Sequence, residues 1–470
     1  MERKILSLHN ILLAILLTSL FLMSYWPHFN YSYPLHIDEW KHLMEAKKIG
    51  LHAFTFEENK IEFFFDSLLY LGSWILPIIA LYQFFPALCW LLSGFLLYVL
   101  VRQHANRWVA LSSLFFLIGM KSNINILGHY FFTPLTASLP FVLLYLILLS
   151  RIIAQPHFTK INLRYLLLFL LLILTFLLYP PSAVLEGFIM LLFLHRLRKK
   201  FLLLSGILIL VVVLGIFLSF LSEYPIGSTL AWATKYIFFE KGWGVAESEY
   251  NLLLLIGMVP LFLLCYGAVK EFKAKKYFLF CLPLYPLLMI LCYHFFSFTL
   301  FIPYQRCLFF IQVFSIPLIA IGFISLLKAF TELIHQDILK NFVSGVLIGF
   351  LLVYLVVSAI VFTQQYPFYH LVEKSDLLAF DYLQSFPYGI VITPLKIALP
   401  LSVMTKHDVI ATAYYYGTPE EKNHITKFYL STCEEQMNIF QELHARYIYS
   451  YQDLGCFHRI YDEDVKLYVQ

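Results

Sequence analysis

Long apolar runs recur along most of this chain, and they constrain its fold more than any other feature. They lie near residues 5–25, 67–101, 108–120, 134–150, 165–179, 182–195, 201–221, 252–269, 277–297, 307–327 and 342–363. A helix needs roughly 20 mostly apolar residues to cross the hydrocarbon core of a membrane. Hydrophobic residues make up 60% of the 470-residue chain and charged residues only 13%, which is more apolar surface than a water-soluble fold could bury. The sequence therefore predicts an α-helical polytopic membrane protein with about eleven spans.

Two of these runs need separate interpretation. The run at 67–101 is too long for one plain crossing and contains Pro77 and Pro86. We expect a short or re-entrant segment followed by a full span there. The first run lies where a signal peptide would, but it is too long, lacks a small-x-small cleavage site and precedes many further spans. We expect it to remain as an uncleaved anchor.

Lysine and arginine concentrate in every second connection between the runs, as in HRLRKK at 195–200 and KEFKAKK at 270–276. The positive-inside rule places those connections in the cytoplasm. With an odd number of spans, the N-terminus is then cytoplasmic and the C-terminus extracytoplasmic. We expect a multi-pass protein of a bacterial or archaeal cell (inner) membrane. Topology explains the basic runs without a nucleic-acid partner, so none is expected.

Two regions lack long apolar runs. The first is an external loop at 26–66, which belongs with the membrane domain 1–363, and the second is the tail 364–470, an extracytoplasmic domain. In the tail, YGIVITP, DVIAT, RYIYSY and VKLYV are typical of strands, whereas LKIALPLSVMTK and EEQMNIFQELHA are typical of helices. Thr418, Pro419 and Glu421 form a capping-box pattern at a helix start. The alternation predicts a small α/β domain with a partly parallel sheet. It contains no phosphate-binding glycine loop, and we expect no nucleotide or other cofactor.

Two pairs of residues leave alternatives open. Cys433 and Cys456 in the tail could form a disulfide in an oxidising compartment or remain as two buried thiols. Gly345 and Gly349 form a small-xxx-small pattern, which tight packing inside the helix bundle explains more readily than dimerisation.

The stretch YPLHIDEWKHLMEAKK, residues 33–48, places several ionisable groups beside a membrane span. In a helix that begins near Asp38, the side chains of Asp38, His42 and Glu45 share one face and apolar side chains lie opposite. This pattern predicts an amphipathic helix on the membrane surface, with its acids turned toward the bundle or the water. The helix dipole keeps a first-turn carboxylate ionised, and a carboxylate beside an imidazole suits general-base catalysis on a hydroxyl. The alternative is an interfacial anchor with a solvated acidic face.

The acids of this loop lack the D-x-D spacing, so a divalent metal is not expected. Glu39 directly follows Asp38 but points about 100° away from it in the helical arrangement. Glu186 lies inside a predicted span, where ionisable groups are costly and often functional. It is about two turns from the end of that span, where it could reach water, and we do not assign it to the site.

Basic residues on the external side are the other candidates. Arg306, in FIPYQRCLFF, lies at the outer mouth of a span, and its planar guanidinium suits a phosphate. The alternative is an arginine that only reaches the lipid headgroups. Lys121 and His129, in KSNINILGHYFFTP, flank another external loop and could contribute charge or a proton.

This layout resembles the glycosyltransferase C superfamily, which includes the protein O-mannosyltransferases, the lipid A aminoarabinose transferases and the oligosaccharyltransferases. The resemblance rests on HIDEW in the first external loop, on Arg306 between late spans, and on the tail pattern TKHDVIATAYYYGTPEE…ELHARYIYSY…VKLYV. It covers most of the chain in layout. It implies a membrane glycosyltransferase of the cell envelope that moves a sugar from a polyprenyl-phosphate-linked donor to a glycan, lipid or protein hydroxyl on the non-cytoplasmic face.

By this resemblance Asp38 would serve the acceptor as base, and Arg306 would clamp the lipid phosphate. A departing phosphate builds negative charge that a preorganised cation stabilises, while the acceptor hydroxyl must lose a proton. The expected site residues are catalytic Asp38 and Glu39 and substrate-binding His42, Lys121, His129 and Arg306. A signature specific to the oligosaccharyltransferases is missing, so a peptide acceptor is not indicated.

Two other functions compete with this one. A transporter or flippase for a lipid-linked glycan would need polar or broken helices at the bilayer midplane, often in related halves. Here the ionisable groups cluster at the external mouth and no internal repeat is visible in the sequence. A scaffold without activity or a glycan polymerase is the third possibility, but a polymerase usually has its large external loop later in the chain.

Overall fold

The computed structural model describes residues 2–50, 62–154, 163–193, 237–240, 252–365, 368–413 and 416–469. These residues form two compact units: Met1–Pro27 with Phe84–Pro367, and His28–Gln83 with Phe368–Gln470. The first-loop segment therefore shares its unit with the tail. The predicted domain boundary, between a membrane domain 1–363 and a tail domain 364–470, stays a prediction.

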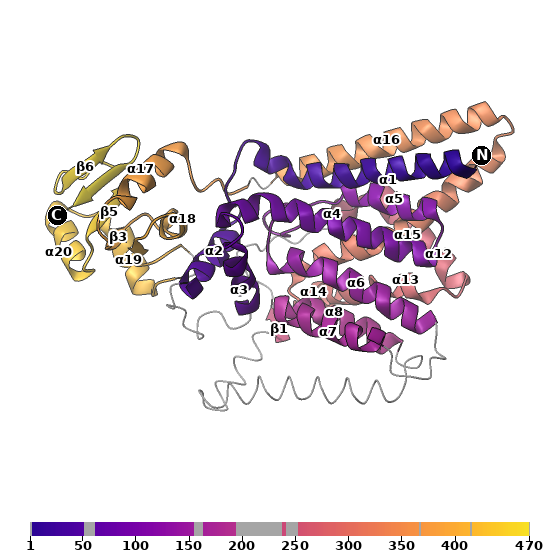
Figure 1. Cartoon of the computed structure of the whole chain (residues 1–470), viewed down its shortest axis with the longest axis horizontal. Coiled ribbons are helices and arrows are strands. Elements are labelled where there is room, and N and C mark those ends of the chain that lie inside the picture. The colour runs from indigo at the N-terminus through magenta and orange to yellow at the C-terminus, as the bar shows by residue number, and fades with distance from the viewer. Residues whose placement is uncertain are drawn as a thin grey trace. The chain divides into compact units, whose positions relative to one another are not determined.

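The first unit is built from helices (Figure 1). They are α1 (Glu2–Tyr25), most of α4 (Ile78–His104), α5 (Arg107–Ile118), α6 (Pro134–Ala154), α7 (Leu163–Leu178), α8 (Pro180–Leu192), α11 (Leu252–Ile256), α12 (Met258–Lys273), α13 (Tyr277–Cys281), α14 (Leu284–Phe296), α15 (Tyr304–Leu333) and α16 (Asp337–Gln364). A short antiparallel pair, β1 (Phe238–Glu240) and β2 (Phe298–Leu300), accompanies them. The 3-10 turn η1 (Trp26–Phe29) follows α1.

The prediction of a multi-helical membrane protein is confirmed. Six helical segments of the described chain are long and apolar enough to cross a membrane: Leu8–Phe29, Ile78–His104, Pro134–Ala154, Tyr277–Phe296, Tyr304–Leu333 and Ile338–Gln364. The run at 67–101 divides as expected into a short helix and the long α4, with Pro77 between them. The predicted span at 252–269 is broken at Gly257, whose φ is +89°. The predicted span at 201–221 and the basic run at 195–200 lie outside the described residues.

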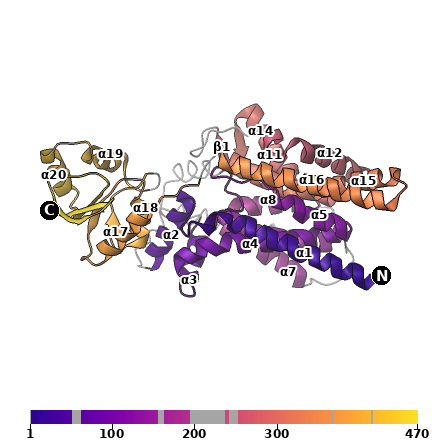
Figure 2. The ribbon, with the colours of Figure 1, turned by 90° about the horizontal axis from the view of Figure 1, so that it is seen from above.

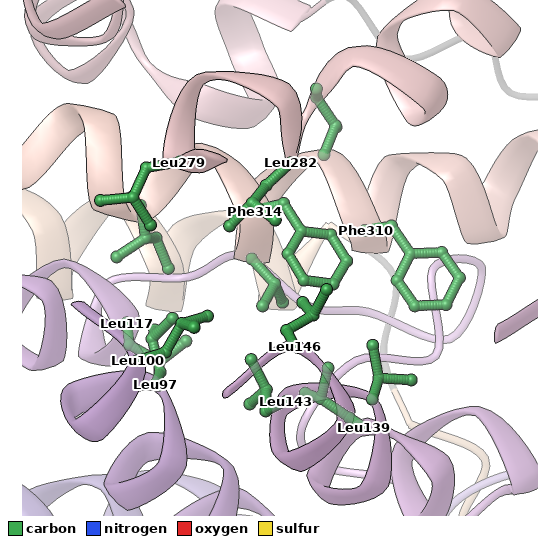
Figure 3. Packing of buried hydrophobic residues seen from close by; sticks show 14 of the residues in the cluster. Leu97, Leu100, Leu117, Leu139, Leu143, Leu146, Leu279, Leu282, Phe310 and Phe314 are labelled. Atoms are coloured by element: carbon green, nitrogen blue, oxygen red, sulfur yellow. The ribbon is translucent and has the colours of Figure 1, made fainter. Parts of the chain in front are cut away.

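Leucine and phenylalanine side chains from five helices fill the interior of this unit (Figure 3). The labelled ones include Leu97 on α4, Leu117 on α5, Leu143 on α6, Leu279 on α13 and Phe314 on α15, all buried. Lipid tails would solvate these side chains almost as well as the protein does, so close packing rather than burial holds such helices together.

Helices α12 and α15 pack at a pair of glycines, and Figure 2 shows the two helices together. A Cβ atom on Gly267 would lie 2.0 Å from the carbonyl oxygen of Leu318, and one on Gly322 would lie 2.1 Å from that of Leu263. The predicted tight packing at Gly345, four residues before Gly349, is wrong: a Cβ at either position on α16 would have no neighbour within 4 Å.

The second unit joins the first-loop segment to the tail. Its helices are α2 (Ile37–Gly50), α3 (Phe63–Gly72), the start of α4, α17 (Lys374–Gln384), α18 (Ala398–Met404), α19 (Pro419–Phe428) and α20 (Cys433–Glu442). Its strands are β3 (Ile390–Ile392), β4 (Asp408–Val409), β5 (Tyr447–Ser450), β6 (His458–Asp462) and β7 (Lys466–Val469). The strand order is β4-β3-β5-β7-β6, and helices α17 to α20 lie around this sheet (Figure 1).

The predicted small, partly parallel sheet is confirmed. Strand β3 pairs in parallel with β4 and β5, whereas β7 pairs antiparallel with β5 and β6. Thr418 and Glu421 form the expected capping box at the start of α19. Strand β6 and helix α17 were not expected. Cys433 and Cys456 form a disulfide, which decides between the two alternatives that the sequence left open.

Candidate functional site

The start of α2 is capped by a reciprocal set of hydrogen bonds around Asp38. The amide of Asp38 donates to Nδ1 of His36 at 3.0 Å, and Oε2 of Glu39 accepts the amides of Leu35 and His36 at 2.7 and 3.0 Å. This is a capping box in which histidine replaces serine or threonine. Glu39 is fully buried and serves the backbone here, whereas the carboxylate of Asp38 is 3.5 Å from the His36 ring and about a quarter (24%) exposed.

The alternative of an anchor with a solvated acidic face on α2 is not supported. His42 and Glu45 are buried, and so are Trp40 and Leu43 on the other side of the helix. The reason is that α3 and α18 both pack against α2. On the α18 side, the ammonium of Lys47 donates to the last carbonyls of that helix.

His42 and Asp66 form a buried pair between α2 and α3. Nδ1 of His42 lies 2.8 Å from Oδ1 of Asp66, and their side chains are 3% and 0% exposed. Phe65 meets the imidazole edge-on, with ring centroids 4.9 Å apart. Burial opposes the charged imidazolium, but Asp66 and Glu62 outweigh it and raise the pKa of His42 above its ordinary value.

A second ion pair adjoins this one. Nζ of Lys41 lies 2.8 Å from Oε2 of Glu62, which precedes α3. Burial works against both charges, yet the pKa of Lys41 is raised by Glu62 and the pKa of Glu62 is lowered by Lys41. Sequence reasoning counted Asp66 only as one of several loop acids. The sequence contained one signal for Asp66, which is the apolar stretch FFFDSLLY around it. A carboxylate in so apolar a helix needs a polar partner.

In the first unit, the loop at 119–133 between α5 and α6 carries Lys121 and His129, and Arg306 contacts this loop from α15. Arg306, in the first turn of α15, donates through Nη1 to the carbonyls of Asn125 and Ile126 at 3.3 and 3.2 Å. Gln312, further along α15, pairs with the backbone of Lys121 through both ends of its amide, at 3.0 Å each. The loop is therefore fastened to α15 at two points.

Lys121 and Arg306 have no acidic partner among the described residues. Lys121 is 8% exposed, its ammonium donates to the carbonyl of Leu254, and the Phe362 ring centroid is 5.6 Å away. Burial lowers the pKa of Lys121. Within the part of the chain that the structure describes, neither cation forms an ion pair with a carboxylate. Lys121 is buried and Arg306 partly buried, and both donate to backbone carbonyls. This arrangement favours an anionic ligand, since a buried charge is normally neutralised.

His129 lies on the same loop but in a different environment. It is 2% exposed, stacks on Trp90 at 5.1 Å and contacts Tyr130 at 4.0 Å between ring centroids. Burial lowers the pKa of His129 to about 3, so the ring is neutral at physiological pH. Ser24 donates to its backbone carbonyl. These contacts are those of a packed ring, and a part for His129 in substrate binding stays a prediction.

An apolar cavity adjoins Lys121. It is partly open and is lined by side chains of α5, α11, α12, α15 and α16, with Gly119 and Met120 from the loop and Gln312 as its polar member. The broken helix at Gly257 runs along this cavity, because Ile256 and Pro260 flank the break and line it.

No family model matches the sequence, and no curated protein does. Solved structures match it over nearly its whole length. The archaeal oligosaccharyltransferase AglB from Archaeoglobus fulgidus, in complex with an inhibitory peptide and a dolichol-phosphate, superimposes with a TM-score of 0.59 at 11% identity, over 94% of this chain and 69% of AglB. The chain has an AglB-like fold. A complex of the A. fulgidus enzyme with Zn and sulfate gives a TM-score of 0.61 at 13% identity, over 93% of this chain and 67% of that one.

The likeness to AglB concerns the fold, because identity this low carries no residue roles. Among the described residues, no group of three or more His, Cys, Asp or Glu side chains could hold a metal ion.

Proposed function

We propose that the protein transfers a sugar from a polyprenyl-phosphate-linked donor to a hydroxyl acceptor, on a glycan, lipid or protein. The observation that carries this proposal is a pair of cations, Lys121 on the loop at 119–133 and Arg306 on α15, which donates to two carbonyls of that loop. Neither cation has a carboxylate partner in the described chain. Lys121 adjoins the apolar cavity, which Met120 lines. A ligand with a phosphate head and a hydrocarbon chain matches both the positive charge of the two cations and the apolar lining of the cavity.

The chemistry divides into two tasks. The acceptor oxygen attacks the anomeric carbon, the bond from that carbon to the phosphate oxygen breaks, and the lipid phosphate leaves with the electron pair. Arg306 and Lys121 stabilise the charge that develops on this phosphate. Asp38 accepts the proton of the acceptor hydroxyl. Glu39 is the weaker candidate for that role because its carboxylate already accepts two backbone amides.

We place the reaction on the non-cytoplasmic face of the cell membrane. The Cys433–Cys456 disulfide supports this placement, since disulfides persist in oxidising compartments and are rare in the cytosol. Asp38 lies in the same compact unit as that disulfide. The distribution of lysine and arginine gives the same orientation. The AglB-like fold also supports a transferase, because AglB is an oligosaccharyltransferase that was solved with a dolichol-phosphate.

A binding experiment tests the phosphate site without knowledge of the sugar. Purified protein in nanodiscs is titrated with undecaprenyl phosphate and, as a control, with undecaprenol, which has the same chain but no charge. We expect the phosphate to bind at least tenfold more tightly, and Arg306→Ala and Lys121→Ala to remove most of that difference, as expected for loss of a charge-assisted hydrogen bond. Lys328→Ala is the matched control, because Lys328 is a largely exposed cation on α15 whose partner is Glu332. Equal binding of the two lipids would overturn the phosphate assignment.

A transfer experiment tests the reaction. Nanodiscs are supplied with undecaprenyl-phosphate and dolichyl-phosphate sugars and with an envelope glycan and lipid extract as acceptors. We expect Asp38→Asn to lower the turnover rate by about 10²–10⁴ while donor binding is kept, and Glu39→Gln to have a milder effect. Full activity in Asp38→Asn would exclude Asp38 as the base. Movement of the intact donor across a proteoliposome membrane without any transfer would instead favour the flippase.

A further inference from the structure

The buried pair of His42 and Asp66 is not used by the reaction described above. A carboxylate only accepts hydrogen bonds, so in the neutral ring the bonded Nδ1 carries the hydrogen and the lone pair falls on Nε2. Nε2 has no hydrogen-bond partner in the part of the chain that the structure describes. Asp66 thus fixes both the tautomer and the orientation of a ring whose second nitrogen can receive a proton.

His42 follows Asp38 by one turn of α2. Side chains four residues apart on a helix lie on the same face, with Cβ atoms about 5–6 Å apart. Both belong to the second unit, so their relation depends only on the helix that carries them. The side chain of Asp38 is 24% exposed and that of His42 only 3%, so Asp38 is the more accessible of the two to an acceptor.

We propose that His42, held in place by Asp66, is a proton relay that takes the acceptor's proton from Asp38 and keeps it until the sugar has been transferred. This inference rests on the proposed function and adds a residue pair to it. Asp66 is then a positioning residue, and His42 acts through Asp38.

The proton balance of the relay is complete. The acceptor hydroxyl gives its proton to the Asp38 carboxylate as its oxygen bonds to the sugar, and the electron pair of the broken bond leaves with the lipid phosphate. Asp38 passes the proton to Nε2 of His42, which becomes an imidazolium paired with Asp66 and later releases the proton to water. A protonated carboxylic acid is a stronger acid than an imidazolium by about two pKa units or more, so this transfer runs downhill.

The charged groups that face His42 determine the pH range in which the relay works. Asp66 from α3 and Glu62 before α3 favour the imidazolium, and Lys41 on α2 opposes it. The pKa of His42 is raised, so the neutral, proton-accepting ring becomes abundant only as the pH rises above about 6.5. Turnover is therefore expected to increase with pH through this range.

The test is the pH profile of turnover for the wild-type protein and three variants in nanodiscs. We expect Asp66→Asn to move the acidic limb to lower pH by about 1–3 units, because it removes the charge that stabilises the imidazolium. We expect His42→Gln to abolish the limb and to lower the maximal rate by about 10². Glu45→Gln, another buried acid on α2, whose partner is Lys48, is the control and should keep the wild-type limb.

The outcomes separate this inference from the proposed function. Absence of transfer by the wild-type protein at every pH would overturn the proposed function itself. Transfer by the wild-type protein, with an acidic limb that stays at the same pH in Asp66→Asn, would overturn the relay, since a purely structural pair would change stability but not the titration. If Asp66→Asn does not fold, His42→Gln alone decides the question, because glutamine can still bond to Asp66 but cannot titrate. An acidic limb that persists in the pH profile of His42→Gln would then overturn the relay.

Discussion

The glycine contact between α12 and α15 makes a quantitative prediction about stability. In Gly322→Ala, the new Cβ would lie 2.1 Å from the carbonyl oxygen of Leu263 and 3.2 Å from the amide nitrogen of Gly267. A carbon and a carbonyl oxygen need about 3.3 Å, so the helices must part by roughly 1 Å along this contact. Overpacking of this kind costs about 1–3 kcal/mol, and the backbone on the other side cannot rotate away.

Gly345→Ala is the matched control, because it makes the same chemical change within a helix of the same unit. Its Cβ would meet no atom within 4 Å, and alanine is favoured over glycine in a helix by about 0.5–1 kcal/mol. Both substitutions gain this helix preference, so the two variants should differ in stability by the cost of the clash, about 1–3 kcal/mol, with Gly322→Ala the less stable. Thermal unfolding in detergent, followed by tryptophan fluorescence, measures the difference. Equal midpoints for the two variants would refute the close approach of α12 and α15.

Three further predictions concern the second unit. Reduction of the Cys433–Cys456 disulfide, which closes a loop with a sequence separation of 23 residues, should destabilise the tail by about 3 kcal/mol, measured by unfolding with and without reductant. Glu39→Ala leaves two backbone amides unsatisfied and should cost about 1–3 kcal/mol, whereas Glu39→Gln retains an acceptor oxygen and should cost less; equal losses would contradict the capping role. The folded-state pKa of His42 is raised, so the pair with Asp66 stabilises the fold below about pH 6.5 and loses its effect as the pH rises through that pKa. The stability difference between wild-type protein and Asp66→Asn should therefore shrink from pH 6 to pH 9, as followed by unfolding midpoints across about these values.

Local signals in the sequence were sufficient for most elements of both units. Apolar runs of spanning length predicted the long helices, because a membrane helix satisfies its own backbone and needs only an apolar surface. In the tail, the capping box at Thr418 and the β-branched runs predicted α19 and the strands β3, β5 and β7. Strand β6, HRIYD, was missed because its charged ends do not show the alternation of a half-buried strand, and it forms through pairing with β7.

The candidate site could be predicted only in part. The sequence singled out Asp38 and Arg306 by residue type and by position beside a span. It treated Glu39 as a second catalytic acid. A glutamate three residues after the N-cap residue is also typical of a capping box, and Glu39 has that role in the structure. It missed Asp66, which lies 24 residues from His42 along the chain and meets it only because α3 packs on α2.

The sequence alone determined which segments of this protein are apolar helices and which form the small mixed sheet, because these depend on the period of side chains along a single segment. Tertiary structure alone decided which polar and small residues meet. The pattern of Gly345 and Gly349 is the better small-xxx-small match, yet among the described helical glycines a Cβ would meet the backbone of another helix at Gly267 and Gly322, on different helices. Whether a residue faces another helix or open space depends on how two helices cross, and the pattern of residues within one segment does not determine this.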